Sequence, residues 1–533
     1  MENQDTTPAV NKHKQIAILV ALFLAGGMQT LTYAPFGYWP LGILSAALTY
    51  FCIIQTPSPR STKRLFAMGW CLGFGIFSSG ASWVYVSIHD YGYTSAPLAI
   101  FLTGAFVALL ALFHGFQFIL FGKLCAPPAR SAPLKKEPKN NTPSTLLAFC
   151  SAWVITDWIR SWILTGFPWL YLGHGHLDSP LSGWAPVLGV YGITLIVVFT
   201  GAAIASLISS ISRIQKAGLV AVACVLFATG YTLKQTEWTQ IDTQKPISVA
   251  IIQGNIDQLI KWEEHYQEET LETYRTLSRP FWGKSIILWP ETAIPIFQHQ
   301  ATGILGALNE MGKVASTTLV TGIPTRQADY EANIYRFYNS ILSLGDGHGL
   351  YHKQKLVPFG EYVPLEDLLR GAIQFFNLPM SSFSLGPKDQ PHLSAGPYQF
   401  ASFICYEIVY PDFVATQARD ADFLITISND AWFGASIGPL QHLEIAQMRA
   451  LETGRYLLRG TNSGVSAIVA PNGRQVGRSK QFVATTLEGT IYPAEGSTPF
   501  MTFGSTPLIL ILFIAPLALL TRYRLRHSNK TKG

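Results

Sequence analysis

The sequence Phe-Ile-Cys-Tyr-Glu at positions 403–407 closes a short apolar run that begins near residue 399. Such a run is typical of a buried strand, and a side chain at the end of a buried strand is held firmly in place. Cys405 is the only cysteine between about residues 235 and 499, so it has no local disulfide partner. This thiol is therefore either a small core residue or a nucleophile, and the rest of the chain must decide between the two.

The composition indicates a membrane protein that also carries a soluble domain. Charged residues make up 13% of the 533 residues, about half of the ~25% usual in soluble proteins. Aromatic residues make up a further 13%, and the mean hydropathy is +0.25. The other five cysteines lie in or beside apolar segments and lack the paired spacing of a zinc site, which argues against a disulfide scaffold and against structural zinc.

Eight apolar segments are candidates for membrane helices, which need about 20 apolar residues. They lie approximately at 16–34, 41–54, 65–88, 97–124, 146–164, 191–211, 217–233 and 506–520. The first could be mistaken for a cleaved signal peptide, but six more spans follow almost at once, so we expect an uncleaved helix. We therefore divide the chain into a helical bundle at 1–234, a catalytic domain at 235–499, and a last helix with a basic tail at 500–533.

The positions of Lys and Arg predict the orientation of these helices. Basic residues gather before the first helix, in alternate loops near 60–64, 123–139 and 213–216, and after residue 521. The intervening loops at 35–40 and 89–94 have none. Because cytoplasmic loops are enriched in Lys and Arg, both termini should be cytoplasmic and the 235–499 domain should lie outside the membrane. This pattern also explains the net charge of +6 without a nucleic-acid partner.

The outer domain alternates between expected strands and helices. Short β-branched or apolar runs occur at 248–253, 285–289, 318–322, 340–343, 400–404, 423–428 and 464–469. Longer stretches between them, at 262–277, 302–315 and 439–459, are candidates for helices. Buried strands with intervening helices predict an α/β sandwich whose helices cover the outer faces.

Three strand ends in this domain carry residues suited to nucleophilic catalysis: Glu291, Lys353 and Cys405. A nearby ammonium lowers the pKa of a thiol and can donate to an oxyanion, alongside the backbone N–H that follows the nucleophile. A carboxylate beside this pair can take the thiol proton and return it to the leaving group. Taken alone, each residue has an inert explanation, as a core thiol, a solvated strand end or a surface charge.

The order of these motifs resembles the carbon–nitrogen hydrolase (nitrilase) superfamily. The motifs are Trp-Pro-Glu at 289–291, Lys353 with Leu-Val-Pro-Phe-Gly-Glu at 356–361, and Cys-Tyr-Glu at 405–407. Gln-Gly-Asn at 253–255 with Lys-Trp at 261–262, Ser-Asn-Asp-Ala-Trp-Phe-Gly at 428–434, Tyr-Ala-Pro-Phe at 33–36 and Gly-Phe-Pro-Trp at 166–169 extend the match. With eight membrane spans around these motifs, the sequence resembles the apolipoprotein N-acyltransferase family over nearly its whole length. The Pro- and Lys-rich loop at 126–144 is the main departure.

The resemblance implies an αββα sandwich beside a bundle of about eight transmembrane helices in a bacterial inner membrane. It implies that Cys405 takes an acyl chain from the sn-1 position of a phospholipid and passes it to the α-amine of a diacylglyceryl-cysteine lipoprotein. Glu291 would act as general base and acid, and Lys353 would stabilise the oxyanion. Glu361 would orient Lys353, and Tyr406 and Glu407 would have supporting roles. No metal and no diffusible cofactor is implied, because the thiol carries the acyl group.

Four aromatic residues are candidates for substrate contacts. The apolar loop at 375–380, which contains Phe376, could dip into the membrane interface as a lid or could be a buried core loop. Trp262 and Trp432 could line the acyl path, although buried tryptophans are common. Trp169 lies in an aromatic outer loop, which could flank a lipid cleft or could simply belong to the aromatic belt of the membrane.

Other readings of the chain remain open at this stage. In a membrane-anchored amidase or nitrilase, water would accept the acyl group, but eight spans exceed what an anchor needs. A transporter would require ionisable residues paired in mid-membrane, of which the sequence has few. Asp157 is better explained by pairing with Arg160, and His174 and His176 lack a matching third metal ligand.

Overall fold

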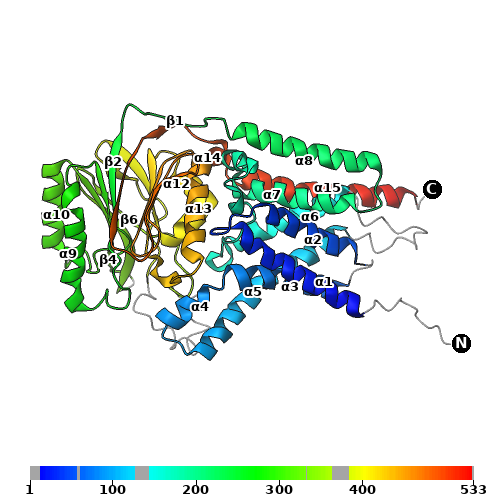
Figure 1. Ribbon diagram of the computed structural model, residues 1–533, viewed down its shortest axis with the longest axis horizontal. Helices are drawn as coiled ribbons and strands as arrows, with labels where there is room; N and C mark the ends of the chain where they lie inside the picture. Colours follow the sequence, from blue (N-terminus) through cyan, green and yellow to red (C-terminus); the bar gives the residue numbers. More distant parts are fainter. Residues whose placement is uncertain (1–11, 57–60, 126–142, 332, 363–382, 531–533) are drawn as a thin grey trace.

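A computed structural model describes residues 12–56, 61–125, 143–331, 333–362 and 383–530. A helical bundle and a β-sandwich lie end to end along the long axis of the molecule (Figure 1). Helix α1 begins and helix α15 ends at the end of the bundle that points away from the sandwich (Figure 1).

Each of the eight expected apolar segments corresponds to a helix or a helix pair. The helices of the bundle are α1 Lys12–Gln29, α2 Pro40–Ile54, α3 Thr62–Gly80, α4 Val84–Val86, α5 Ala96–Cys125, α6 Pro143–Arg160, α7 Ala185–Leu207, α8 Arg213–Leu233 and α15 Thr506–Lys530. Within the described ranges, four of them (α1, α5, α7 and α8) are long and apolar enough to cross a membrane. Helix α2 and the apolar part of α15 are shorter.

The third segment differs from the single helix that was expected. Helix α3 ends at Gly80, and the chain continues at an angle of 63° through α4 and a short π-helical turn, Ser87–Tyr91. A Cβ at Gly80 would lie 2.6 Å from the side chain of Leu170, so the helix end packs closely against an outer loop. After this break, α4 and the π-helical turn contact the 3₁₀ turn at Asp430–Phe433 of the outer domain.

Helices α1 and α3 meet through small residues, as is usual between membrane helices. A Cβ added at Gly26 would lie 2.2 Å from the carbonyl oxygen of Leu72, and one at Gly75 would lie 2.1 Å from that of Phe23. Neither contact leaves room for a side chain, so these two glycines set the spacing between the helices.

The sandwich contains two six-stranded sheets. Their strand orders are β13–β2–β3–β4–β5–β6 and β12–β11–β10–β9–β8–β7. The first comprises β2 Ile247–Gln253, β3 Ile286–Leu288, β4 Thr318–Asp329, β5 Ile334–Gly345, β6 Gly349–His352 and β13 Thr485–Ile491. The second comprises β7 Leu393–Ala395, β8 Tyr398–Ile404, β9 Phe423–Ser428, β10 Leu457–Thr461, β11 Ala467–Val469 and β12 Gln475–Arg478. In each sheet three parallel strands are flanked by antiparallel ones, and β1 Gln240–Ile241 pairs separately with β14 Ala494–Glu495.

The layers of the sandwich follow from the alternation of side chains along its strands. On β2, Val249 and Ile251 join the core between the two sheets, whereas Ala250 and Ile252 face α9 Gln267–Ser278 and α10 Thr302–Ala315. Helices α12 Pro411–Gln417 and α13 Gly438–Thr453 cover the outer face of the second sheet. The expected αββα arrangement is therefore confirmed.

Helix α13 is buried on both sides because the membrane bundle packs against its other face (Figure 1). A single hydrophobic core runs from the bundle through α12 and α13 into the second sheet. The catalytic domain is thus anchored to the membrane part by a broad internal contact as well as by the chain connections.

Two expected helix boundaries were wrong. The stretch 439–459 is a helix only to Thr453, because Gly454 has a left-handed φ of +62° and β10 follows. The stretch 262–277 becomes α9 only from Gln267. The end of α13 is therefore a local glycine cap, because glycine adopts the left-handed conformation readily.

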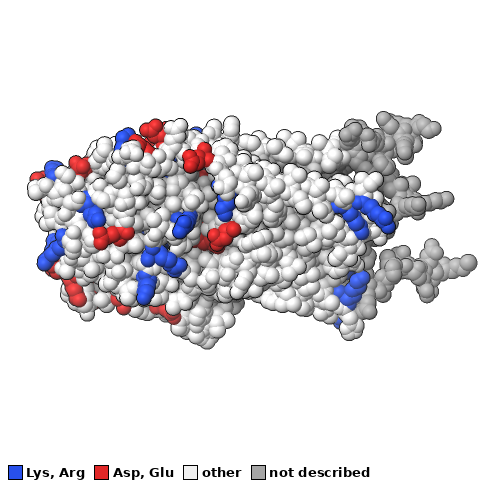
Figure 2. Space-filling view, turned by 45° about the horizontal axis from the view of Figure 1, so that its top comes forward, with Lys and Arg blue, Asp and Glu red and all other residues white. Residues whose placement is uncertain are grey.

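The surface charge divides the molecule into three zones. On the face shown in Figure 2, charged residues are scattered over the sandwich and reappear at the far end of the bundle, while the stretch between them is uncharged. An uncharged band of this kind is expected where helices contact lipid.

Candidate active site

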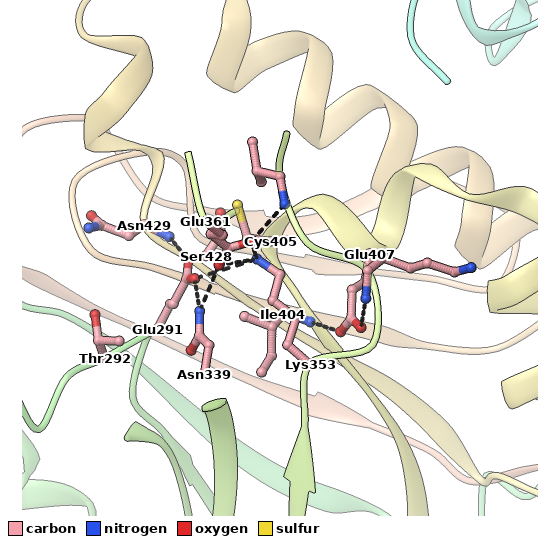
Figure 3. Close-up of polar contacts among 12 residues, drawn as sticks. Glu291, Thr292, Asn339, Lys353, Glu361, Ile404, Cys405, Glu407, Ser428 and Asn429 are labelled. Carbon is pink, nitrogen blue, oxygen red and sulfur yellow. Dashed lines mark hydrogen bonds and ion pairs between the residues drawn. The ribbon is translucent and has the colours of Figure 1, made fainter. Parts of the chain in front are cut away.

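The three proposed catalytic residues each follow the end of a strand. Cys405 directly follows β8, Lys353 directly follows β6, and Glu291 comes three residues after the end of β3. Figure 3 shows the side chains of Glu291, Lys353 and Cys405 converging on one another. Residues separated by more than 100 positions in the sequence are therefore brought into one cluster.

The backbone at Cys405 is strained. Its φ is +52°, in the left-handed region that costs a non-glycine residue about 1–2 kcal/mol. The strain turns the chain sharply from β8 into a 3₁₀ turn, Cys405–Val409, so the thiol is presented at the edge of the sheet. Strain of this kind persists only where surrounding contacts hold it.

The carboxylate of Glu407 provides much of that holding, and its side chain is fully buried. One oxygen accepts a hydrogen bond of 2.7 Å from the N–H of Ile404. The other accepts hydrogen bonds from the N–H groups of Gln354 and Lys355, at 2.6 and 3.1 Å, and from the Tyr351 hydroxyl, at 2.9 Å. Glu407 thus connects the segment that carries the thiol to the segment that carries Lys353.

Both oxygens of Glu291 are hydrogen-bonded. The side-chain amide of Asn339 donates to one at 2.7 Å, and the backbone N–H of Asn429 donates to the other at 2.7 Å. The same Asn339 amide also donates to Glu361 at 3.2 Å, so it bridges two carboxylates. These bonds fix the orientation of Glu291 relative to the thiol.

The ammonium of Lys353 is fully buried and lies between two carboxylates. Its Nζ is 2.8 Å from Glu361 and 4.0 Å from Glu291. Glu361 is itself held by the N–H of Val357, at 2.9 Å. Glu361 therefore lies where it can orient the ammonium of Lys353.

A second buried lysine, Lys261, lies behind Glu291. Its Nζ donates to the carbonyl oxygen of Glu291 at 3.1 Å and to the Thr292 hydroxyl at 2.7 Å. Burial lowers its pKa to about 8, against the attraction of the Glu291 carboxylate. The two lysines and the two carboxylates, Glu291 and Glu361, can therefore balance one another in charge.

The electrostatic environment keeps the resting thiol protonated. Burial, followed by the charge of Glu291, raises the pKa of Cys405 to about 12, although Lys353 opposes the shift. Burial and the neighbouring Glu361 raise the pKa of Glu291 above its usual range, against the ammonium of Lys353. Burial alone would lower the pKa of Lys353, but Glu361 and Glu291 outweigh it and raise the net value. The thiol therefore carries its proton at neutral pH, and attack by the sulfur would require a neighbouring group to accept that proton.

Sequence reasoning assigned no role to Asn339 or Lys261. Asn339 lies in strand β5 with its side chain buried, and because this burial arises only on folding, no signal in the sequence points to it. Lys261 was quoted in a motif, but nothing in the sequence indicates that its ammonium is buried beside Glu291. Asn429 and Asp430 belong to the Ser-Asn-Asp-Ala-Trp-Phe-Gly motif at 428–434, but the sequence indicated no role for either residue.

The aromatic residues proposed as substrate contacts have different surroundings. Trp169 is buried, and its indole N–H donates to Gln441 on α13 at 2.8 Å. Trp432 packs against the ring of Tyr91, with centroids 5.5 Å apart, beside the broken helix. Trp262 is partly buried next to Lys261, and Phe376 lies outside the described residues.

Tyr406 joins the nucleophile turn to the membrane part. Its hydroxyl donates to the carbonyl oxygen of Gly166 at 2.8 Å, and Tyr410 donates to that of Thr165 at the same distance. The outer loop that carries Trp169 is therefore bonded directly to the turn that follows Cys405.

The polar residues noted in and near the membrane have protein partners. Asp157 pairs with Arg160 at 2.8 Å, as expected. The ring of His176 contacts the Ser179 hydroxyl at 3.0 Å, and that of His174 contacts Arg449 at 3.4 Å. Within the described part of the chain, no three His, Cys, Asp or Glu side chains are grouped so that they could hold a metal.

Comparison with known proteins identifies both parts of the chain. Residues 25–203 match the N-terminal domain of apolipoprotein N-acyltransferases, and residues 248–497 match the carbon–nitrogen hydrolase family. The apolipoprotein N-acyltransferase of Pseudomonas aeruginosa strain UCBPP-PA14 is 44% identical over 491 residues, which cover 91% of this chain and 92% of that protein. This chain belongs to the apolipoprotein N-acyltransferase family.

More distant members of the family show the same correspondence. The apolipoprotein N-acyltransferase of Vibrio cholerae serotype O1 is 39% identical over 517 residues, covering 95% of this chain and 97% of that protein. Among solved structures, an amidase from Nesterenkonia sp. is 16% identical with a TM-score of 0.32, over 49% of this chain and 94% of that one. The full-length match makes the chain an acyltransferase of this family and disfavours the amidase alternative.

Proposed function

We propose that this apolipoprotein N-acyltransferase moves an acyl chain from the sn-1 position of a phospholipid to the α-amine of a diacylglyceryl-cysteine lipoprotein, through a thioester on Cys405. The convergence of Cys405, Lys353 and Glu291 at the edge of the two sheets is the observation that carries the proposal. Neither half-reaction requires a cofactor, because the sulfur holds the acyl group between them.

In the first half-reaction, the sulfur attacks the ester carbonyl while its proton passes to Glu291. The carbonyl oxygen becomes an oxyanion, which Lys353 stabilises together with the backbone N–H of Tyr406. The C–O bond then breaks, and Glu291 returns the proton to the departing alkoxide. The products are a thioester on Cys405 and a lysophospholipid.

In the second half-reaction, the neutral α-amine attacks the thioester carbonyl. A C–N bond forms, Glu291 takes one proton from the amine nitrogen, and the C–S bond breaks. The thiolate recovers that proton from Glu291. The raised pKa of Glu291 suits this exchange, since it makes the carboxylate a stronger base for the amine proton than a carboxylate of ordinary pKa.

The membrane bundle would keep both substrates in lipid while they react. Each CH₂ drawn from lipid into water would cost about 0.8 kcal/mol, so a long chain has to move without leaving an apolar environment. Several features support this role: the uncharged band, the internal contact between α13 and the bundle, and the bonds between the nucleophile turn and the outer loop. The aromatic candidates Trp169, Trp262, Trp432 and Phe376 remain proposed substrate contacts.

We further propose that the bundle spans 1–234, the catalytic domain spans 235–499, and both termini are cytoplasmic with the catalytic domain in the periplasm. The basic residues near the starts of α1, α3 and α8 and the end of α5 support this orientation. Gly303→Cys, on an exposed part of α10, should react with a membrane-impermeant maleimide once the outer membrane is permeable. Labelling only after lysis of the inner membrane would reverse the orientation.

Mass spectrometry of the purified full chain tests the chemistry. After incubation with phosphatidylethanolamine vesicles, the wild-type protein should carry one acyl group on Cys405, and a diacylglyceryl lipopeptide should discharge it. Cys405→Ala should show no adduct, and Glu291→Gln should acylate far more slowly. Release of the label as free fatty acid, with none on the lipopeptide, would instead indicate a hydrolase.

A further inference from the structure

A buried polar cluster contacts the backbone of the nucleophile turn at Cys405. It is formed by His442 of α13, Asp430 and Arg459, all of them buried. The Arg459 guanidinium lies 2.6 Å from one oxygen of Asp430 and 3.1 Å from Nδ1 of His442. The opposite ring nitrogen of His442, Nε2, lies 3.2 Å from the carbonyl oxygen of Cys405.

The contacts of the imidazole fix which ring nitrogen carries hydrogen. A carbonyl oxygen can only accept, so Nε2 of His442 carries a hydrogen and donates it to Cys405. Nδ1 faces the Arg459 guanidinium, which can only donate, and therefore acts as acceptor. One oxygen of Asp430 also lies 3.2 Å from Nδ1, but this oxygen accepts a hydrogen bond from the Ser428 hydroxyl at 2.7 Å.

This hydrogen bond acts on the peptide that joins Cys405 to Tyr406. In a trans peptide the C=O and the N–H point in opposite directions. Holding the carbonyl oxygen of Cys405 toward His442 therefore turns the N–H of Tyr406 away from α13. A hydrogen bond to a peptide oxygen also polarises the N–H of the same peptide and makes it a stronger donor.

We propose that His442 is a positioning residue for the oxyanion site, holding the Cys405–Tyr406 peptide so that its N–H meets the developing negative charge. The inference rests on the proposed role of Cys405 as nucleophile. Without such a hold, a peptide that follows a residue with φ +52° could rotate back and withdraw the donor.

The surroundings of the ring connect this peptide to the membrane part. The indole of Trp169 lies over His442 with ring centroids 5.5 Å apart, and the neighbouring Gln441 accepts the indole N–H at 2.8 Å. Phe433 closes another side at 6.0 Å. The outer loop thereby keeps the imidazole in the one orientation in which Nε2 meets Cys405.

Two reactions of the same thiol separate this role from a general effect on the site. Acylation by phosphatidylethanolamine vesicles passes through an oxyanion, whereas alkylation by iodoacetamide does not. In the full-length protein, His442→Phe should lower the acylation rate roughly 10- to 100-fold. This loss should not exceed the loss caused by removing a direct oxyanion donor. Its alkylation rate should stay within about twofold of wild type.

His442→Gln is the matched variant, because its terminal amide N–H can reach the same carbonyl oxygen. It should recover most of the acylation rate, whereas His442→Asn, an amide of shorter reach, should behave like His442→Phe. If the phenylalanine variant does not fold, the acylation rates of His442→Gln and His442→Asn test the same hydrogen bond.

Three outcomes would overturn the inference. Equal losses of acylation and alkylation would mean that His442 places the thiol and not the oxyanion donor. Wild-type acylation in His442→Phe or His442→Asn would mean that the peptide needs no such hold. Equal impairment of the Gln and Asn variants would remove the hydrogen bond as the cause. If wild-type Cys405 never forms an acyl adduct, the proposed function itself fails, which is a distinguishable result.

Discussion

Replacing Glu407 with glutamine should loosen the active site from behind. The carboxylate accepts four hydrogen bonds, and a glutamine can offer only one acceptor oxygen. If that oxygen faces Gln354, Lys355 and Tyr351, the amide NH₂ faces the N–H of Ile404. The substitution then leaves a buried donor unsatisfied and removes charge assistance from three bonds.

The magnitude follows from those losses. An unsatisfied buried donor costs about 1–3 kcal/mol, and each charge-assisted bond that becomes neutral loses roughly 1 kcal/mol. Burial raises the pKa of Glu407 to about 7, so part of the charge assistance is already offset at neutral pH. We therefore expect a loss of about 2–4 kcal/mol in the free energy of unfolding, which corresponds to a fall in Tm of roughly 5–15 °C.

The assay combines thermal unfolding in detergent with the initial rate of Cys405 acylation. Because Glu407 connects the segments that carry Lys353 and Cys405, a misplacement of about 1 Å could slow acylation about 100-fold. Glu310→Gln is the matched control, since Glu310 is exposed and pairs with Lys313 at 2.9 Å, and it should leave both Tm and acylation at the wild-type values. Wild-type Tm and acylation in Glu407→Gln would refute the reasoning.

Three further predictions follow from the same contacts. Because burial raises the pKa of Cys405 to about 12, its alkylation by iodoacetamide should rise about tenfold per pH unit from pH 7 to 10, and a plateau below pH 8 would contradict this. Asn339→Leu removes a donor that stabilises the ionised form of Glu291, so the pKa of Glu291 should rise further. As the pH falls, Glu291 then becomes protonated at a higher pH, so the acidic limb of the kcat/KM profile should move up by about one pH unit. An acidic limb at the wild-type position would exclude this role for Asn339. Gly75→Val should lower Tm because α1 leaves no room for the side chain, while Gly218→Val on α8, where nothing lies within 4 Å, should not; equal effects would contradict the proposed helix contact.

Much of the architecture could be predicted from sequence because it depends on local patterns. Apolar segments of about 20 residues and short apolar runs indicated the membrane helices and the buried strands around Cys405. The broken span at Gly80 could not be predicted in this way, because Gly80 packs against Leu170 of an outer loop that is distant in the sequence.

The candidate site likewise contains residues that could be found from the sequence and residues that could not. Glu291, Lys353 and Cys405 could be found from the sequence because each follows a strand end and their order resembles a known family. Asn339 and Lys261 could not, since their polar groups acquire a role only when folding buries them beside Glu291.

By itself, the sequence determined the kinds of layer, the membrane spans and the residue types available for catalysis, because hydrophobic periodicity and strand-end chemistry are local properties. Only the tertiary structure decided which polar groups face one another. Burial removes water from the thiol, the ammonium and the carboxylates, so their protonation depends on neighbours that lie up to 114 positions away in the chain, as for Glu291 and Cys405. The hold of His442 on the peptide after Cys405 belongs to this second kind of information.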